Sequence, residues 1–293
     1  MLGLPKERMV TGRKIVFLDI DGTLITDRQE FPESARRVVD EAQRRGHLLF
    51  LATGRSLPEI YPWLLDVGFD GIVGGNGSYA QVGDRVLFEH LIPEPRLAAL
   101  NAYFETKRVD VVFQSSRQLY PSPGFVERFQ VLADAARKRG EGGVNLGGAD
   151  WSPLVKIFQT FLGGRPHEVS KATFVCPDDG SLTLDEVIAH WGEEFSIVHG
   201  SLDLMGSENG ELVLSGVSKG RAAMEVAQEL GIPITDTVAF GDSENDVELI
   251  RDCGVGIAMG NARPVVKDVA DWVTAPIDED GLAKGFAHAG LVG

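Results

Sequence analysis

Four acidic side chains stand out because each follows directly on a short apolar run. Asp19 and Asp21 come just after the run Ile15–Leu18, and Asp242 and Asp246 come after a second run far along the chain. If the two loops meet, four carboxylates converge, and like charges that close repel each other unless a cation lies between them. Hard oxygen ligands of this kind suit Mg²⁺, which usually leaves room for a substrate phosphate. The sequence therefore predicts a magnesium site.

The same strand ends carry groups suited to phosphoryl transfer. Asp19 and Asp21 are two residues apart, so in an extended chain they point the same way with Cα atoms ~7 Å apart. One can attack phosphorus while the other handles the proton of the leaving group. Thr53–Gly54 offers a hydroxyl and a free N–H, and Lys219 can neutralise the transferring phosphoryl group. Positioning, a metal and charge stabilisation are what this reaction needs.

Each motif taken alone has a simpler interpretation. Asp242 or Ser243 can cap a helix, and Asn76–Gly77 can form a tight turn. An isolated Lys219 is more typical of a solvated surface. The chemical interpretation is favoured because all of these groups occur in order and at strand ends.

The elements that carry these groups alternate between strand and helix. A strand that is apolar at every position is typical of a parallel sheet covered on both faces. A helix is expected from Pro32 to Gly46, and another from Ser218 to Gly231. We expect strands at 15–18, 47–52, 71–73, 238–240, 255–259 and 272–274. This pattern predicts an α/β fold with an open parallel-sheet, Rossmann-like core.

The middle of the chain has a different pattern. Strands are expected at 110–114, 155–162, 172–176 and 195–199, helices at 95–107, 125–139 and 184–191, and a glycine-rich loop at 140–148. We interpret it as an α+β cap domain inserted into the core. Three consecutive domains would instead leave the N-terminal sheet incomplete. The predicted division is core 1–87, cap 88–210 and core 211–293.

Composition narrows the possible partners. The chain has 293 residues, with 28 Lys and Arg against 43 Asp and Glu, for a formal charge of −15. Such a surface disfavours nucleic acid and anionic lipid. Two distant cysteines indicate neither a disulfide framework nor a zinc site, and no secretory or membrane-spanning segment is apparent. We expect a cytoplasmic protein, with no membrane or nucleic-acid partner, as a monomer or small homo-oligomer.

Four motifs together resemble those of the haloacid dehalogenase-type superfamily. They are Asp19–Leu24 (DIDGTL), Ala52–Arg55 (ATGR), Gly216–Gly220 (GVSKG) and Gly241–Asp246 (GDSEND). Three further segments are similar to its Cof-like branch, which has a large α/β cap after the third strand: 74–77, 258–262 and 278–282. The resemblance spans most of residues 12–90 and 211–290, whereas the middle matches only in position and size.

The resemblance implies a role for each matching residue. Asp19 would be the nucleophile, forming an aspartyl-phosphate and binding Mg²⁺, and Asp21 would be the general acid and base and supply its carbonyl to the metal. Asp242 would ligate Mg²⁺, with Asp246 supporting it. The phosphate would be held by Thr53, Gly54, Lys219 and Asn245, helped by the backbone at Ile20.

The leading hypothesis is a Mg²⁺-dependent phosphatase of small phosphorylated metabolites, sugar phosphates first. A phosphomutase on the same scaffold and a non-catalytic metabolite-binding regulator are the alternatives. The predicted cap holds 11 Lys and Arg against 17 Asp and Glu, which argues against the second phosphate site that a mutase needs. Regulators of this kind often lose the nucleophile, which is present here. The candidate substrate contacts in the cap are Arg117, Lys156 and Arg165.

Overall fold

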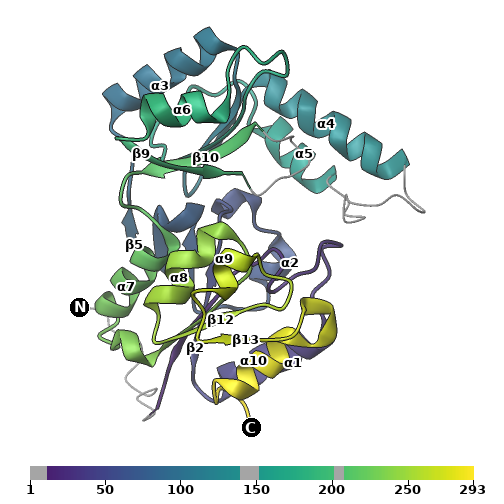
Figure 1. The fold of residues 1–293 in the computed structure, drawn as a ribbon, viewed down its shortest axis with the longest axis vertical. Helices are drawn as coiled ribbons and strands as arrows, with labels where there is room; N and C mark the ends of the chain where they lie inside the picture. The colour runs from purple at the N-terminus through teal and green to yellow at the C-terminus, as the bar shows by residue number, and fades with distance from the viewer. Residues whose placement is uncertain (1–11, 139–151, 201–207) are drawn as a thin grey trace.

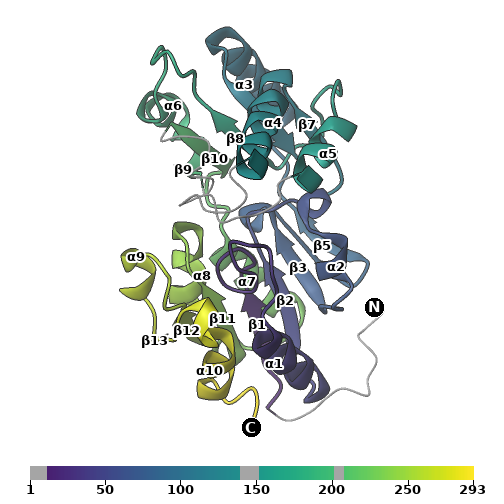
Figure 2. The ribbon, with the colours of Figure 1, turned by 90° about the vertical axis from the view of Figure 1, so that its right-hand side faces the viewer.

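The computed structural model describes residues 12–138, 152–200 and 208–293. Its strands form two sheets, one of eight strands and one of five. Figure 1 shows the five-stranded sheet with its helices above the larger sheet, and Figure 2 shows the same two tiers from the side. We call the lower tier the core and the upper tier the cap.

The core sheet has the order β13-β12-β11-β1-β2-β3-β4-β5. The six strands from β13 to β3 pair in parallel, and β4 and β5 continue the sheet in antiparallel fashion. Their bounds are β1 Ile15–Leu18, β2 Leu48–Ala52, β3 Gly71–Gly74, β4 Tyr79–Val82, β5 Arg85–Glu89, β11 Thr237–Gly241, β12 Val255–Ala258 and β13 Trp272–Val273.

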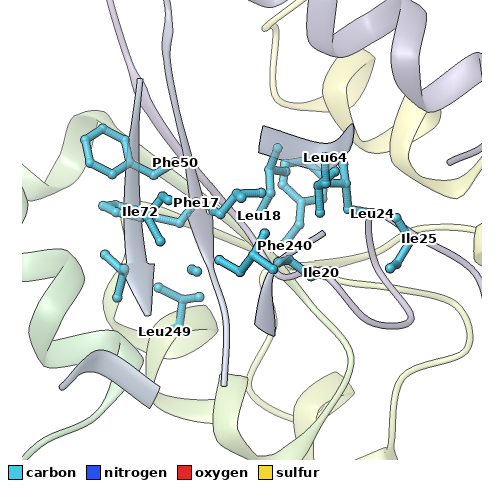
Figure 3. Packing of buried hydrophobic residues seen from close by; sticks show 14 of the residues in the cluster. Phe17, Leu18, Ile20, Leu24, Ile25, Phe50, Leu64, Ile72, Phe240 and Leu249 are labelled. Atoms are coloured by element: carbon cyan, nitrogen blue, oxygen red, sulfur yellow. The ribbon is translucent and has the colours of Figure 1, made fainter. Parts of the chain in front are cut away.

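The central strands are buried along their whole length because helices cover both faces of the sheet. Every residue of β1, β2 and β11 is buried. Phe17 of β1 packs against Phe50 of β2 with ring centroids 5.5 Å apart, and Phe240 of β11 belongs to the same cluster (Figure 3). Burying such side chains contributes about 2 kcal/mol each, so the centre of the sheet is a firm platform for the loops that follow it.

The helices form two layers because the chain leaves β1 in one direction and β11 in the other. Right-handed crossovers then put α1 (Glu33–Arg44) and α8 (Val247–Asp252) on opposite faces. The first packs beside α10 (Gly281–His288) and the second beside α7 (Lys219–Glu229). Two shorter helices, α2 (Pro62–Leu65) and α9 (Pro264–Lys267), lie at the periphery.

The cap sheet is antiparallel throughout, in the order β7-β6-β8-β10-β9. One face packs on α3 and α6 through a separate apolar cluster, and part of the other face packs on α4 and α5. The bounds are β6 Asp110–Gln114, β7 Leu119–Pro121, β8 Lys171–Val175, β9 Phe195–His199, β10 Asn209–Leu214, α3 Glu94–Lys107, α4 Pro123–Lys138, α5 Ser152–Thr160 and α6 Leu184–Trp191.

The predicted fold class is confirmed, but one predicted element is wrong. The strand expected at 155–162 is helix α5, because Leu154, Val155 and Phe158 share one face of a helix that packs against α4. Strands β4 and β5 were not predicted. The glycine-rich loop expected at 140–148 lies outside the described residues.

The predicted domain boundaries fall inside two strands. Residue 87 lies within β5 of the core sheet, and residue 210 lies within β10 of the cap sheet. We propose that the cap instead runs from about residue 90 to Leu214, which keeps both strands whole. In the described part of the chain, no helix combines the length and the apolar character that crossing a bilayer requires.

Candidate active site

The candidate site lies beyond the end of β1, where the strand order of the core sheet reverses: the chain continues to β2 on one side of β1 and later returns to β11 on the other. Asp19 follows β1, Thr53 follows the neighbouring strand β2, and Asp242 follows β11 on the other side. The Asp19 N–H donates to the carbonyl of Phe240 at 3.1 Å, which ties the first loop to the end of β11. Ligands of open parallel sheets bind in the crevice at such a switch point.

A buried lysine joins two carboxylates from different loops. The Nζ of Lys219, at the start of α7, donates to Oδ1 of Asp19 at 2.7 Å and to Oδ1 of Asp246 at 2.6 Å. The lysine side chain has no exposed surface, and the two carboxylates are 8% and 0% exposed. Ser218 caps α7 by accepting from the Arg221 N–H, which fixes where the helix begins and therefore where Lys219 points.

The loop after β11 holds its two acidic residues differently. Both oxygens of Asp246 are occupied, since Oδ2 accepts the N–H groups of Asp242 and Ser243 at 3.1 Å each. Asp242 accepts weaker hydrogen bonds from the hydroxyls of Thr23 and Ser243. A Cβ on Gly22 would lie 2.6 Å from the Asp242 carboxylate, and its φ of +85° favours glycine, so this residue lets the two loops approach.

The electrostatics follow from crowding negative charge in a buried place. Burial, together with the charges of Asp246 and Asp242, raises the pKa of Asp19 well above its usual range despite Lys219. Burial and Asp246 likewise raise the pKa of Asp242 to about 7. Burial lowers the pKa of Lys219, but Asp19 and Asp246 outweigh this effect and raise it above its usual value. One lysine thus leaves part of the negative charge uncompensated.

This arrangement fits a hard divalent cation. Asp19, Asp242 and Asp246 each offer a carboxylate oxygen, and these oxygens lie within 4.8 Å of one another. The donors are all oxygen, and a cation beside them would relieve the repulsion that raises the two pKa values. Asp246 accepts from the Lys219 ammonium and two backbone N–H groups, whereas Asp242 accepts only two hydroxyls, which can turn to make room for a cation.

The carboxylate of Asp21 does not join this group. It forms a two-point ion pair with Arg55, at 2.7 and 2.8 Å, while its side chain stays 48% exposed. Arg55 is itself fixed, since it donates to the carbonyl of Glu59 and stacks over the ring of Tyr61 at 4.8 Å. The ion pair orients a partly solvated carboxylate beside the buried one.

Besides Lys219, two of the residues predicted to hold phosphate meet beside Asn76, since a Cβ on Gly54 would lie 2.9 Å from Oδ1 of Asn76 and 3.3 Å from Nδ2 of Asn245. Thr53 is 1% exposed, and its hydroxyl accepts the N–H of Arg55 at 3.1 Å. The side-chain amide of Asn245 donates to Oδ1 of Asn76 at 2.9 Å, while its own buried Oδ1 has no hydrogen-bond partner among the described residues. Ile20 has a fully buried side chain, so only its backbone is available to the site.

The three cationic cap residues that the sequence suggested, Arg117, Lys156 and Arg165, are exposed. Sequence reasoning assigned no role to Arg55, although it directly follows the Thr53–Gly54 pair at a strand end. It also missed Lys171, whose Nζ donates to the carbonyl of Gly54 at 2.6 Å. The sequence does place Lys171 at the start of an otherwise largely apolar strand, and this unusual position could have drawn attention to it.

A parallel α/β core with carboxylates at the end of its first strand, and an α+β cap inserted into it, is the architecture of haloacid dehalogenase-type enzymes. The chain matches the family model described as haloacid dehalogenase-like hydrolase over residues 16–286. It belongs to this family, and the predicted resemblance is confirmed.

Individual relatives match over nearly their whole length. The chain is 30% identical over 279 residues to YkrA of Bacillus subtilis (strain 168), whose name gives it provisionally as a phosphatase, covering 95% of this chain and 98% of that one. It is 30% identical over 275 residues to the HMP-PP phosphatase of Cronobacter sakazakii, covering 92% of each chain.

A solved structure supports the same assignment. The sugar phosphatase BT4131, of haloacid dehalogenase subclass IIB, superimposes with a TM-score of 0.73 at 26% identity, covering 95% of this chain and 100% of that one. The predicted enzyme class, a phosphoric monoester hydrolase of this family, is confirmed by the family match and the names of the relatives.

Proposed function

We propose that this enzyme is a Mg²⁺-dependent phosphatase that hydrolyses small phosphorylated metabolites, with sugar phosphates as the leading class. The observation that carries the proposal is the buried group of Asp19, Lys219, Asp242 and Asp246, which combines a carboxylate nucleophile with cation ligands and a fixed positive charge. The names of the sugar phosphatase and the HMP-PP phosphatase support small metabolites as substrates.

In the proposed reaction, a carboxylate oxygen of Asp19 attacks phosphorus. The bond from phosphorus to the ester oxygen breaks, and Asp21, which is half exposed and takes up a proton from solvent beforehand, gives that proton to the departing oxygen. A water molecule then loses a proton to Asp21 and attacks phosphorus, and the aspartyl-phosphate bond breaks to release inorganic phosphate. Arg55 holds Asp21 where it can reach the ester oxygen, through the two-point ion pair.

The remaining residues stabilise charge on the phosphoryl group. Lys219 balances the negative charge of the phosphoryl group as that group moves from the ester oxygen to Asp19, and the Thr53 hydroxyl, the Gly54 N–H, the Asn245 amide and the Ile20 backbone hold the phosphate oxygens. Asp19, the carbonyl of Asp21 and Asp242 would hold Mg²⁺, and Asp246 would orient Lys219 and the loop after β11. When bound, Mg²⁺ would neutralise phosphate charge and polarise the phosphoryl group.

The test is hydrolysis of an aryl phosphate such as p-nitrophenyl phosphate, with and without Mg²⁺. Asp19→Asn should lower kcat by about 10³-fold or more, because it removes the nucleophile. Asp27→Asn is the matched control, since Asp27 lies in the same loop and is exposed, and it should stay within about twofold of wild type. An Asp19→Asn enzyme as active as wild type would refute the proposed mechanism.

A further inference from the structure

The cap places two charged side chains in an unusual position. Lys171 of β8 and Glu211 of β10 form an ion pair with Nζ and Oε2 3.1 Å apart, and their side chains are only 2% and 8% exposed. The neighbouring residues Ala172, Phe174 and Leu212 point to the opposite, apolar face of the cap sheet. A buried sheet face is normally apolar, because burying a charge is costly unless it is fully paired.

Both charges reach across to the core. The Nζ of Lys171 donates to the carbonyl of Gly54 at 2.6 Å, and Oε2 of Glu211 accepts from the side-chain amide of Asn76 at 2.6 Å. Asn76 in turn donates its backbone N–H to the carbonyl of Thr53 at 3.1 Å and accepts from Asn245. We refer to Lys171, Glu211 and Asn76 as the cap clamp.

The residues of the cap clamp contact the loop at Thr53 and Gly54, which the proposed function assigns to phosphate binding. A Cβ on Gly54 would lie only 2.9 Å from Oδ1 of Asn76, the residue that Glu211 holds, so glycine is favoured there. Asn76 itself has a φ of +57°, in the left-handed region that few residues other than glycine adopt readily. This loop is therefore shaped by side chains of the cap as well as by the core.

A second contact holds the other end of the same loop. The Nε2 of Gln114, from β6 of the cap, donates to Oε2 of Glu59 at 2.7 Å, and the same oxygen accepts the N–H of Ser56. The loop from Gly54 to Glu59 also carries Arg55, which orients Asp21. Side chains of the cap therefore form hydrogen bonds at both ends of this loop, to Gly54 and to Glu59.

We propose that Lys171 and Glu211 are positioning residues that fix the phosphate loop when the cap is docked on the core. Lys171 holds the Gly54 carbonyl, and Glu211 holds Asn76, so that the Thr53 hydroxyl and the Gly54 N–H face the phosphate. This inference rests on the proposed function. Docking of the cap then completes the phosphate site, so catalysis depends on a pair that does not touch the reacting atoms.

The decisive variants separate positioning from folding. Lys171→Met or Glu211→Gln alone leaves one buried charge without its partner and destabilises the protein. The double variant removes both charges of the pair, and the amide oxygen that Glu211→Gln introduces can still accept from Asn76, so the double variant should unfold at a higher temperature than either single variant. It should stay somewhat below wild type, because the buried Glu59 also loses the charge of Lys171. Lys107→Met, at an exposed lysine of α3 in the cap, is the control.

The readouts are kcat/KM for p-nitrophenyl phosphate with Mg²⁺, inhibition by inorganic phosphate, and thermal unfolding. We expect the double variant to be more stable than either single variant while its kcat/KM stays about 10- to 100-fold below wild type and inhibition by phosphate weakens. Lys171→Arg, which keeps the donor, should recover part of the activity. The control should match wild type in all three measurements.

Three results would overturn the proposal. If the double variant regains both stability and wild-type kcat/KM, the pair only stabilises the fold. If p-nitrophenyl phosphate is unaffected while a sugar phosphate is hydrolysed poorly, Lys171 contacts the leaving group instead. If wild type releases no phosphate from any ester in Mg²⁺, the proposed function fails and the inference fails with it, whereas the first two results leave the proposed function intact.

Discussion

Replacing Lys219 with methionine tests the balance of charge in the buried site. Methionine keeps most of the apolar stem but removes the ammonium group that lies 2.7 Å from Asp19 and 2.6 Å from Asp246. No part of the Lys219 side chain is exposed, so water cannot replace it. Asp19 and Asp246 then lie close to each other and to Asp242 with no positive charge between them.

The size of the effect follows from these distances. At an effective dielectric constant of about 20, a unit charge pair at such a distance attracts by about 6 kcal/mol before desolvation is subtracted. Breaking a buried ion pair costs about 3–5 kcal/mol in practice. We therefore expect Lys219→Met to lose about 3–5 kcal/mol of unfolding free energy in metal-free buffer, and kcat to fall about 10²- to 10³-fold.

The assay is urea unfolding without metal, combined with hydrolysis of p-nitrophenyl phosphate in Mg²⁺. Lys284→Met, at an exposed position of α10, is the control and should change neither. A second variant, Lys219→Met with Asp246→Asn, should regain stability but not activity. If Lys219→Met unfolds at the same urea concentration as wild type and keeps its kcat, the electrostatic account of the site is wrong.

Three further outcomes are expected. Arg55→Lys cannot make the two-point pair with Asp21 or stack in the same way on Tyr61, so kcat should fall about tenfold and thermal stability should also drop, as steady-state kinetics and thermal unfolding would show; an unchanged kcat would count against orientation by Arg55. Mg²⁺ at about 100 times its Kd should add about 2.7 kcal/mol to the unfolding free energy, and much less in Asp242→Asn, measured by thermal unfolding; an equal gain in both would exclude Asp242 as a ligand. Burial and nearby cations lower the pKa of His47, whose Nδ1 accepts the N–H of Lys14. At His47 the unfolded state therefore binds more protons below about pH 6.5, so the contribution of this residue to stability should fall as the pH drops from about 8 to about 5, while the raised pKa values of Asp19 and Asp242 act in the opposite direction. The stability difference between wild type and His47→Asn in urea unfolding should therefore change over this pH range, and a constant difference would refute the assignment.

The core could be predicted because its signals are local. The run Ile15–Leu18 is apolar at every position, which only a strand covered on both faces requires, and Gly46 ends the helix that follows. Because parallel strands share an edge, the convergence of Asp19 and Asp242 followed from the order of the elements. The error at 155–162 arose from a β-branched and aromatic composition, whereas the spacing of its buried residues has a helical period.

The contacts between the cap and the core could not be predicted in this way. Lys171 and Gly54 are more than one hundred residues apart in sequence, and they meet only because the two sheets dock on each other. Glu211 looks like a strand residue facing solvent until the core covers it. The Arg55–Asp21 pair was within reach of sequence reasoning, since both residues follow neighbouring strands.

The most direct test of the account is the site of covalent modification during turnover. The enzyme would be quenched in acid during hydrolysis of an aryl phosphate in Mg²⁺ and then digested. The masses of the peptides would be measured by mass spectrometry. We expect one phosphoryl group on the peptide that contains Asp19, and none in Asp19→Asn. Steady turnover with that peptide unmodified, or with the phosphoryl group on another residue, would contradict the central claim.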